Sequence, residues 1–325
     1  VEKTGIPAAW TILGLSALPT KHPLNVGMVG MHGNYGPNVL TNECDVLIAI
    51  GMRFDDRVTG NLDHYAKQAK VVHLEIDPAE INKNVYADFP VLGNVKETLK
   101  ILMELVQPKS HKEWHNRFKE LYKTEYEKVI SGNLDVNKPD LGMAEVIQEI
   151  NINTKGNAVI VSDVGQHQMA ACRYSDFTQT RSNVTSGGLG TMGFALPAAI
   201  GAKMGSPKRE VVAIIGDGGY QMTIQELGTI FQTKVPVKIV VLNNGFLGMV
   251  RQWQQLFFDR RYASTEMTNP DFVTIAKGYH IEANRVTDRS QLKDAVKTMI
   301  DHDGPYFLEV KVEQEENVFP MVPTG

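Results

Sequence analysis

Two short polar motifs in this chain have the residue types and spacing of a metal site. Gly216-Asp217-Gly218 follows the apolar run 211–215, and Asn243-Asn244 follows the apolar run 238–242. Both runs are typical of buried strands, and the apolar residues of 224–231 between them recur at helical spacing. A strand–helix–strand unit has parallel strands, so Asp217 and Asn244 should lie at carboxyl strand ends, where open α/β sheets bind ligands.

The chemistry of these side chains favours a hard cation. A carboxylate, an amide oxygen and backbone exposed by glycine suit Mg²⁺ held together with a diphosphate. Gly-Asp-Gly alone is usually only a turn. The paired asparagines, 26 and 27 positions after Asp217 and beyond a helix and a strand, favour a site instead. The two motifs together resemble the signature of enzymes that bind thiamine diphosphate.

Two further segments are placed to approach the same ligand. Residues 165–169, Gly-Gln-His-Gln-Met, follow a predicted strand at 158–161. Residues 186–193 form a glycine-rich loop before a predicted apolar helix at 194–202, and such a loop lets backbone come close to a ligand. The alternative for this loop is a flexible connector with Met192 in the core.

Length and composition indicate a globular protein with two domains. The chain has 325 residues, of which 42% are hydrophobic and 22% charged. Its net charge of −4 comes without a long basic run, which argues against nucleic-acid binding. No apolar run approaches the about 20 residues that span a bilayer, and no signal peptide is visible. Cys44 and Cys172 are expected to be reduced core residues.

The organisation along the chain predicts three parts. Residues 1–107 alternate strands, such as 45–51 and 70–77, with other segments, and a short helix is expected from Ala79. They lack a Gly-x-Gly-x-x-Gly fingerprint, which argues against a nicotinamide dehydrogenase. Residues 108–138 are expected to form a helical connector, whose stripe of Trp114, Phe118 and Leu121 should pack against a domain. Residues 139–325 form the predicted diphosphate-binding domain.

Several segments closely resemble the acetohydroxyacid synthase (acetolactate synthase) family of thiamine diphosphate enzymes, over nearly the whole chain. The most specific are Arg-Phe-Asp-Asp-Arg-Val-Thr-Gly at 53–60 and Gly-Met-Val-Arg-Gln-Trp-Gln at 248–254. Others are 22–24, 27–33, 165–169, 186–193 and 242–244.

The resemblance implies an α/β fold with two doubly wound parallel-sheet domains, a partial FAD-type middle domain and a thiamine diphosphate-binding domain. The family has a preceding pyrimidine-binding domain with an activating glutamate, and nothing in these residues replaces that glutamate. Because the chain opens at Val1 without methionine, we expect it to be the carboxyl-terminal part of a longer protein. We therefore expect it to be inactive alone.

The resemblance also implies the site residues. The metal would be held by Asp217, Asn244 and the carbonyl of Phe246. Met192 would support the thiazolium ring, and Met249 and Trp253 would shape the pocket for the second keto acid; from spacing alone, a core stripe is the alternative for that pair. Thiamine diphosphate would contact Gly165, Gln166, His167, Gln168, Gly190, Met192, Gly216, Gly218, Gly219, Asn244, Phe246, Gly248 and Met249. FAD would contact His32, Gly33, Gly51, Arg53, Asp55, Glu75 and Asp77, although a solvated charged loop is the alternative for 53–57.

The implied activity is the decarboxylative condensation of pyruvate with pyruvate or 2-ketobutyrate in branched-chain amino acid synthesis. Implied partners are a second copy of the chain, in a dimer or tetramer with active sites at the subunit interface, and a small regulatory subunit. No membrane partner is expected. The compartment would be the bacterial cytoplasm, or a plastid or mitochondrion. The alternatives are another thiamine diphosphate-dependent decarboxylase, oxidase or carboligase, and a cofactor-binding fragment without activity.

Overall fold

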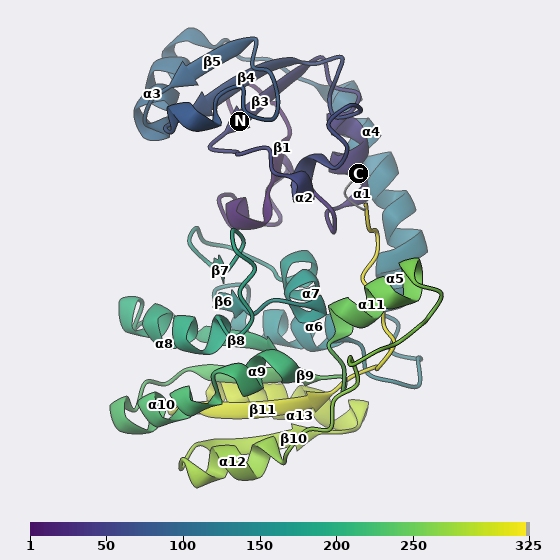
Figure 1. Ribbon diagram of the computed structural model, residues 1–325. Helices are drawn as coiled ribbons and strands as arrows, with labels where there is room; N and C mark the ends of the chain where they lie inside the picture. The colour runs from purple at the N-terminus through teal and green to yellow at the C-terminus, as the bar shows by residue number, and fades with distance from the viewer. Residues whose placement is uncertain (323–325) are drawn as a thin grey trace. The chain divides into compact units, whose positions relative to one another are not determined.

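The computed structural model describes residues 1–322, which form two compact units (Figure 1). The first unit consists of 1–14, 22–130 and the described residues from 319 onward. The second unit consists of 15–21 and 131–318. Within the described residues, no helix is both long and apolar enough to cross a membrane.

The second unit is built on a six-stranded sheet in the order β10-β11-β9-β8-β6-β7, with every neighbouring pair parallel. This arrangement confirms the predicted α/β class with parallel sheets. The strands are β6 (Val159–Ser162), β7 (Asn183–Thr185), β8 (Val211–Gly216), β9 (Lys238–Asn243), β10 (Glu282–Val286) and β11 (Tyr306–Lys311).

The central strands are apolar except at their ends because helices cover both of their faces. One set of alternating residues, including Val161, Ala213 and Ile239, belongs to a core completed by α8, α9, α10 and α12. The other set, including Val212 and Val240, is equally buried. It lies on the face where α6, α7 and α13 pack together. The helices are α6 (Met143–Thr154), α7 (Gln166–Tyr174), α8 (Ala195–Gly205), α9 (Asp217–Met222), η4 (Ile224–Glu226), α10 (Leu227–Thr233), α11 (Gly248–Phe257), α12 (Phe272–Gly278) and α13 (Arg289–Asp301).

The crossover between β8 and β9 differs in detail from the sequence pattern. Instead of one helix over 224–231, it contains α9, η4 and α10. Thr223 interrupts them because its backbone, at φ −134° and ψ 22°, is not helical. Asp217 is the first residue of the short helix α9, rather than part of an isolated turn.

The first unit contains two small parallel sheets, β1-β2 and β3-β4-β5. Its elements are β1 (Ala8–Trp10), η1 (Ile12–Gly14), β2 (Asn25–Met28), α1 (Tyr35–Thr41), β3 (Val46–Ile50), α2 (Asp56–Thr59), β4 (Lys70–Glu75), η2 (Pro78–Glu80), β5 (Phe89–Leu92), α3 (Val95–Leu105), α4 (Lys112–Glu125) and the π-helix η3 (Tyr126–Ile130). The helix expected from Ala79 is only the three-residue turn η2, because Ile81 already has an extended backbone.

The predicted connector contains α4 and η3 of the first unit, then α5 (Ser131–Asn133) of the second. Phe118 and Leu121 of α4 lie against Gly36 of α1, where a β-carbon would stand 3.5 Å from the Phe118 ring. The Trp114 ring meets Phe118 edge-on at 5.8 Å. The prediction that this stripe packs against a domain is therefore confirmed.

Candidate cofactor and metal site

Three neighbouring strands of the second unit end in buried polar residues. Asp163 follows β6, Asp217 follows the last residue of β8, and Asn244 follows β9. Their side chains are at most 5% exposed. The strands β6, β8 and β9 are adjacent and parallel (Figure 1). The three residues that follow them therefore lie at the same edge of the sheet. The predicted placement of Asp217 and Asn244 at neighbouring strand ends is confirmed.

The two carboxylate oxygens of Asp217 have different surroundings. Oδ2 accepts from the side-chain amide of Asn269 at 2.7 Å and from the N–H of Gly245 at 3.1 Å. Oδ1 accepts from the N–H of the adjacent Gly218 at 3.1 Å. Burial raises the pKa of Asp217, and these donors oppose that rise. A divalent cation would favour the same ionised form that the donors favour.

Asn244 and Phe246 offer neutral oxygens beside this carboxylate. The side-chain oxygen of Asn244 accepts from the N–H of Phe246 at 3.2 Å. Phe246 pairs with Glu266 in an isolated antiparallel bridge. The hydrogen bonds of that bridge join Leu247 to Thr265 and Met267 to Gly245, so the bridge does not use the Phe246 carbonyl. A carboxylate, an amide oxygen and a carbonyl form the donor set that Mg²⁺ takes when phosphates and water complete its shell.

Glycines make room for an imidazole next to the strand ends. A β-carbon on Gly216 would stand 2.6 Å from Nδ1 of His167, and one on Gly165 would stand 2.7 Å from its Cε1. Gly165 also has a φ of 149°, which few other residues adopt. His167 is buried, and its Nε2 has no hydrogen-bond partner among the described residues. Burial lowers the pKa of His167 to about 3, so the ring is neutral.

Gln166 and Gln168 begin α7 beside His167 and are also buried. The amide of Gln168 donates to the Thr185 hydroxyl at 2.7 Å. The amide of Gln166 donates to the side-chain oxygen of Gln252 at 2.9 Å, and its own oxygen occupies the space a β-carbon on Gly248 would need. These residues therefore fix α7 against β7 and α11.

The glycine-rich loop is tied to the strand ends through Asp163. Its two carboxylate oxygens accept from the N–H groups of Gly193 and Phe194, each at 3.1 Å. A β-carbon on Gly219 would lie 1.9 Å from Asp163 Oδ2, so a larger residue at 219 would collide with this carboxylate. The loop carries Met192, which is half-buried, and Gly190, which has a φ of 63°.

Helix α11 has an unusual distribution of side chains. Arg251 and Gln252 are fully buried, whereas Met249 and Trp253 are half-buried and Val250 is exposed. The Trp253 ring lies 4.8 Å from that of Phe257, which is itself exposed. Met249 and Trp253 are thus not a core stripe, because the buried side of the helix is the polar one.

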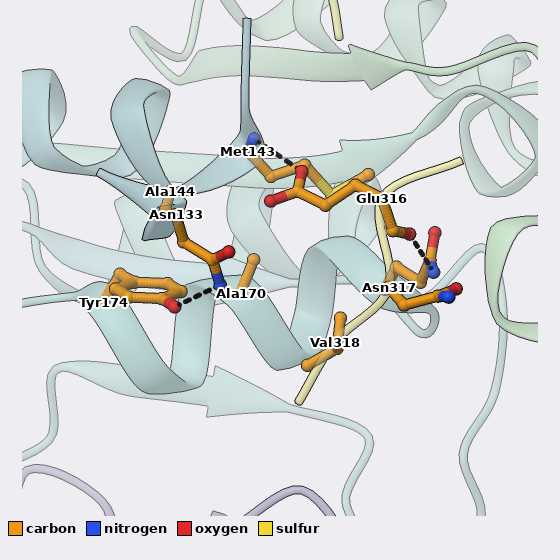
Figure 2. Close-up of a pocket in the computed structure, with 9 residues that line it drawn as sticks. Asn133, Met143, Ala144, Ala170, Tyr174, Glu316, Asn317 and Val318 are labelled. Carbon is orange, nitrogen blue, oxygen red and sulfur yellow. Dashed lines mark hydrogen bonds between the residues drawn. The ribbon is translucent and has the colours of Figure 1, made fainter. Parts of the chain in front are cut away.

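The polar side of α11 holds the segment that ends the second unit. Gln252 donates to the carbonyl of Val318 at 3.1 Å and accepts from its N–H at 2.9 Å. A small pocket lies along this segment, and in Figure 2 the Asn133 amide donates to the Tyr174 hydroxyl across it. Glu316 accepts from the N–H of Met143 in the same pocket, and burial raises the pKa of this glutamate. The hydrogen bonds of Glu316 and Val318 along this pocket hold the segment against α6 and α11.

The residues expected to contact FAD lie in the first unit, at carboxyl strand ends and the turns after them. Gly51 follows β3, and the guanidinium of Arg53 is 4.0 Å from Asp55. Asp55 and Asp77 accept from backbone N–H groups at the start of α2 and η2. Glu75 accepts from the N–H groups of Ile76 and Asp77 at 2.8 and 3.1 Å.

These acids therefore already stabilise their own turns, which leaves them less free to accept from a ribose than the sequence suggests. In the preceding loop His32 is buried, and a β-carbon on Gly33 would stand 2.5 Å from the Met28 carbonyl.

Sequence reasoning missed Asp163 and Asn269 of the second-unit site, and it gave no role to Asn243 and Gln252, although both lie in motifs that it singled out. Asp163 was detectable, since an aspartate after a buried strand resembles Asp217. Asn269 lies 52 residues after Asp217 in an irregular loop, where no local pattern marks it. The described residues contain no group of three His, Cys, Asp or Glu side chains able to bind a metal by themselves, so a cation here depends on amide, carbonyl and phosphate oxygens.

Comparison with protein-family models gives two matches. The model for "Thiamine pyrophosphate enzyme, C-terminal TPP binding domain" matches residues 163–310. The model for "Thiamine pyrophosphate enzyme, central domain" matches residues 1–102. All three strand ends described above lie within the first match.

Individual relatives are similar over the full chain. It is 42% identical over 323 residues to acetolactate synthase isozyme 2 large subunit of Escherichia coli K12, covering 99% of this chain and 58% of the relative. It is also 42% identical to chloroplastic acetolactate synthase 1 of Oryza sativa subsp. japonica, covering all of this chain and 52% of the relative. A probable acetolactate synthase large subunit of Methanocaldococcus jannaschii is likewise 42% identical, with 56% of its length covered. The chain spans about half the length of these relatives.

Proposed function

The chain belongs to the thiamine pyrophosphate enzymes, as a homologue of acetolactate synthase large subunits. We therefore propose that it is part of the catalytic subunit of a thiamine diphosphate- and Mg²⁺-dependent acetolactate synthase. The reaction would be the decarboxylative condensation of pyruvate with a second 2-keto acid, either pyruvate or 2-ketobutyrate. The observation that supports the cofactor assignment best is the pairing of buried Asp217 and Asn244 at adjacent parallel strand ends.

Three residues would hold the cation. Asp217 would supply a carboxylate oxygen, Asn244 its side-chain oxygen and Phe246 its carbonyl, with cofactor phosphates and water completing the octahedron. Asp217 brings the single negative charge of this protein donor set. It therefore has the largest expected effect on cation affinity.

Other residues would bind and orient the cofactor. Nε2 of the neutral His167 has no partner among the described residues and suits a hydrogen bond to a phosphate oxygen. If Nε2 carries the proton it would donate directly, and if it does not it would accept from a water that bridges to the phosphate. Gly165, Gly216 and Gly218 would let backbone approach, and Met192 would support the ring from the glycine-rich loop with a polarisable thioether. Bound thiamine diphosphate would supply the electron sink for loss of CO₂.

Met249 and Trp253 would shape the pocket for the second keto acid. Both are half-buried on the side of α11 that turns away from the polar anchor formed by Arg251 and Gln252. An indole beside the substrate would favour an ethyl over a methyl group by about 1–3 kcal/mol, the limit for one methylene in an apolar pocket.

The remaining assignments rest on the homology. We propose FAD as a cofactor of the first unit, bound near Gly51 and Arg53, without a role in net redox chemistry. We also propose an oligomer of this chain and a small regulatory subunit as partners. The bacterial cytoplasm or an organelle stays the predicted compartment.

The reaction is tested by product analysis. The full-length protein is incubated with pyruvate, Mg²⁺ and thiamine diphosphate, and 2-acetolactate is the expected product. Acetaldehyde or acetyl phosphate in its place would reject the proposal in favour of a decarboxylase or an oxidase.

The cofactor site is tested by calorimetric titration of thiamine diphosphate into three proteins. Asp217→Asn removes the carboxylate charge, so Mg²⁺-dependent binding should fall steeply, by about 10- to 100-fold or more. Phe246→Ala keeps the carbonyl and should bind nearly as the unaltered protein does. If Asp217→Asn binds like the unaltered protein, the metal-site assignment is wrong.

A further inference from the structure

One oxygen of Asp217 is held by a loop distant in sequence. Asn269 lies between α11 and α12, and its amide nitrogen is 2.7 Å from Asp217 Oδ2. The loop that carries it is fastened to the 245–247 segment by two backbone hydrogen bonds, Leu247 to Thr265 and Met267 to Gly245, each 2.8 Å long. The donor to Asp217 is thus attached to the segment that contains the proposed carbonyl ligand.

A chain of hydrogen bonds fixes the direction of the Asn269 amide. The Glu309 carboxylate can only accept, and it takes the amide N–H of Asn243 at 2.7 Å. Asn243 must therefore turn its oxygen the other way, where it accepts from Asn269 at 3.2 Å and from the N–H of Gly245 at 3.1 Å. The Asn269 amide group consequently has its nitrogen toward both Asn243 and Asp217.

The two ends of this chain keep it in one orientation. At one end Glu309 is 1% exposed and pairs with Arg285 at 2.6 Å and Lys311 at 3.1 Å, so it remains an acceptor. At the other side of Asn269, its oxygen accepts from the amide of Gln221 at 2.9 Å. A flipped Asn269 would place its oxygen against Asp217 and Asn243 and its nitrogen against a donor.

We propose that Asn269 is a positioning residue of the cation site: it holds Oδ2 of Asp217 and leaves Oδ1 as the oxygen that binds the metal. This inference rests on the proposed thiamine diphosphate function. Rotation about the last side-chain bond of aspartate has broad, shallow minima. Without Asn269, only the longer bonds from the N–H groups of Gly245 and Gly218, each 3.1 Å, would restrain the carboxylate, so it would sample more orientations. Partners that fix the direction of a ligand commonly matter to metal affinity nearly as much as the ligand itself.

The test measures the Mg²⁺ concentration that half-saturates thiamine diphosphate binding in the full-length protein. Asn269→Ala removes the donor and should raise that concentration about tenfold or more. Asn269→Ser, which keeps a short polar side chain, serves as the second variant in case the first folds poorly. Gln221→Ala is the matched control. It removes the donor to the Asn269 oxygen, but Asn243, oriented by Glu309, still turns the Asn269 nitrogen toward Asp217, so the concentration should change little.

A second readout separates positioning from stability. The thermal unfolding midpoint of each variant is measured without cofactor, and binding is titrated at a temperature at which every variant is folded. In an Asp217→Asn background, Asn269→Ala should add little, because the carboxylate whose free oxygen would bind the metal is gone. If the half-saturating Mg²⁺ concentration is unchanged in both Asn269 variants, the inference is overturned and the proposed function is unaffected. Binding that needs no Mg²⁺ in the unaltered protein would instead overturn the proposed function, and the inference with it.

Discussion

At the scale of single residues, His167 combines burial with an unpaired ring nitrogen. Its pKa is about 3 in the folded chain, against an ordinary value of 6.5, because burial disfavours the charged ring. Between these values the unfolded chain binds more protons. Stability is therefore fully present above pH 6.5 and falls as the pH drops toward 3, by about 1.4 kcal/mol for each pH unit below 6.5.

We expect His167→Gln to remove this contribution to acid sensitivity. Urea unfolding without cofactor, at pH 7.5, 6 and 5, would show a smaller loss of unfolding free energy in the variant. His64→Gln, at an exposed position, is the control and should retain the full slope. An unaltered slope in His167→Gln would show that the ring titrates normally.

At the scale of elements, the glycine-rich loop depends on a single carboxylate. Asp163 accepts the first N–H groups before α8, and it is fully buried. Asp163→Asn keeps the size but turns an NH₂ group toward one of these donors. We expect a loss of about 1–3 kcal/mol in the unfolding free energy, since one buried N–H loses its acceptor.

The same variant should speed amide hydrogen exchange over 186–195 and weaken thiamine diphosphate binding, because Met192 lies on this loop. Asp259→Asn, at an exposed position, is expected to change neither property. Exchange in the loop that matches the unaltered protein would contradict a positioning role for Asp163.

At the scale of the whole molecule, the second unit includes a short piece of chain from within the sequence of the first. The hydroxyl of Ser16 accepts from the N–H groups of Ser182 and Asn183, at 3.0 and 3.3 Å. It is 4% exposed. Ser16→Ala should therefore destabilise the second unit by about 1–3 kcal/mol and leave the first nearly unaffected.

Hydrogen exchange measured separately over each unit checks this expectation. Protection should fall around 182–183 in Ser16→Ala. Thr4→Ala removes a hydroxyl that bonds at the surface of the first unit, so it should leave residues 182–183 unchanged. Equal loss of protection in both units would contradict the assignment of residues 15–21 to the second unit alone.

Local patterns in the sequence determined the strands and ligands of the central crossover. Apolar runs give β8 and β9 because strands covered on both faces need apolar residues at every position. The polar residues that follow the runs then mark the sheet edge. The α4 stripe was predictable on similar grounds, since its apolar spacing repeats within a few residues.

Only the tertiary structure decided what surrounds those ligands. Asn243 and Glu309 meet because β11 lies beside β9 in the sheet, although it is the last strand in sequence. Asn269 joins Asn243 from the loop between α11 and α12. The buried polar side of α11 depends on the segment that ends at Val318, which supplies the acceptors. Within the second unit, Ser16 bonds to residues more than 160 positions later in the chain. Periodicity reports burial within one element, whereas hydrogen-bond partners of this kind are set by strand order and chain path.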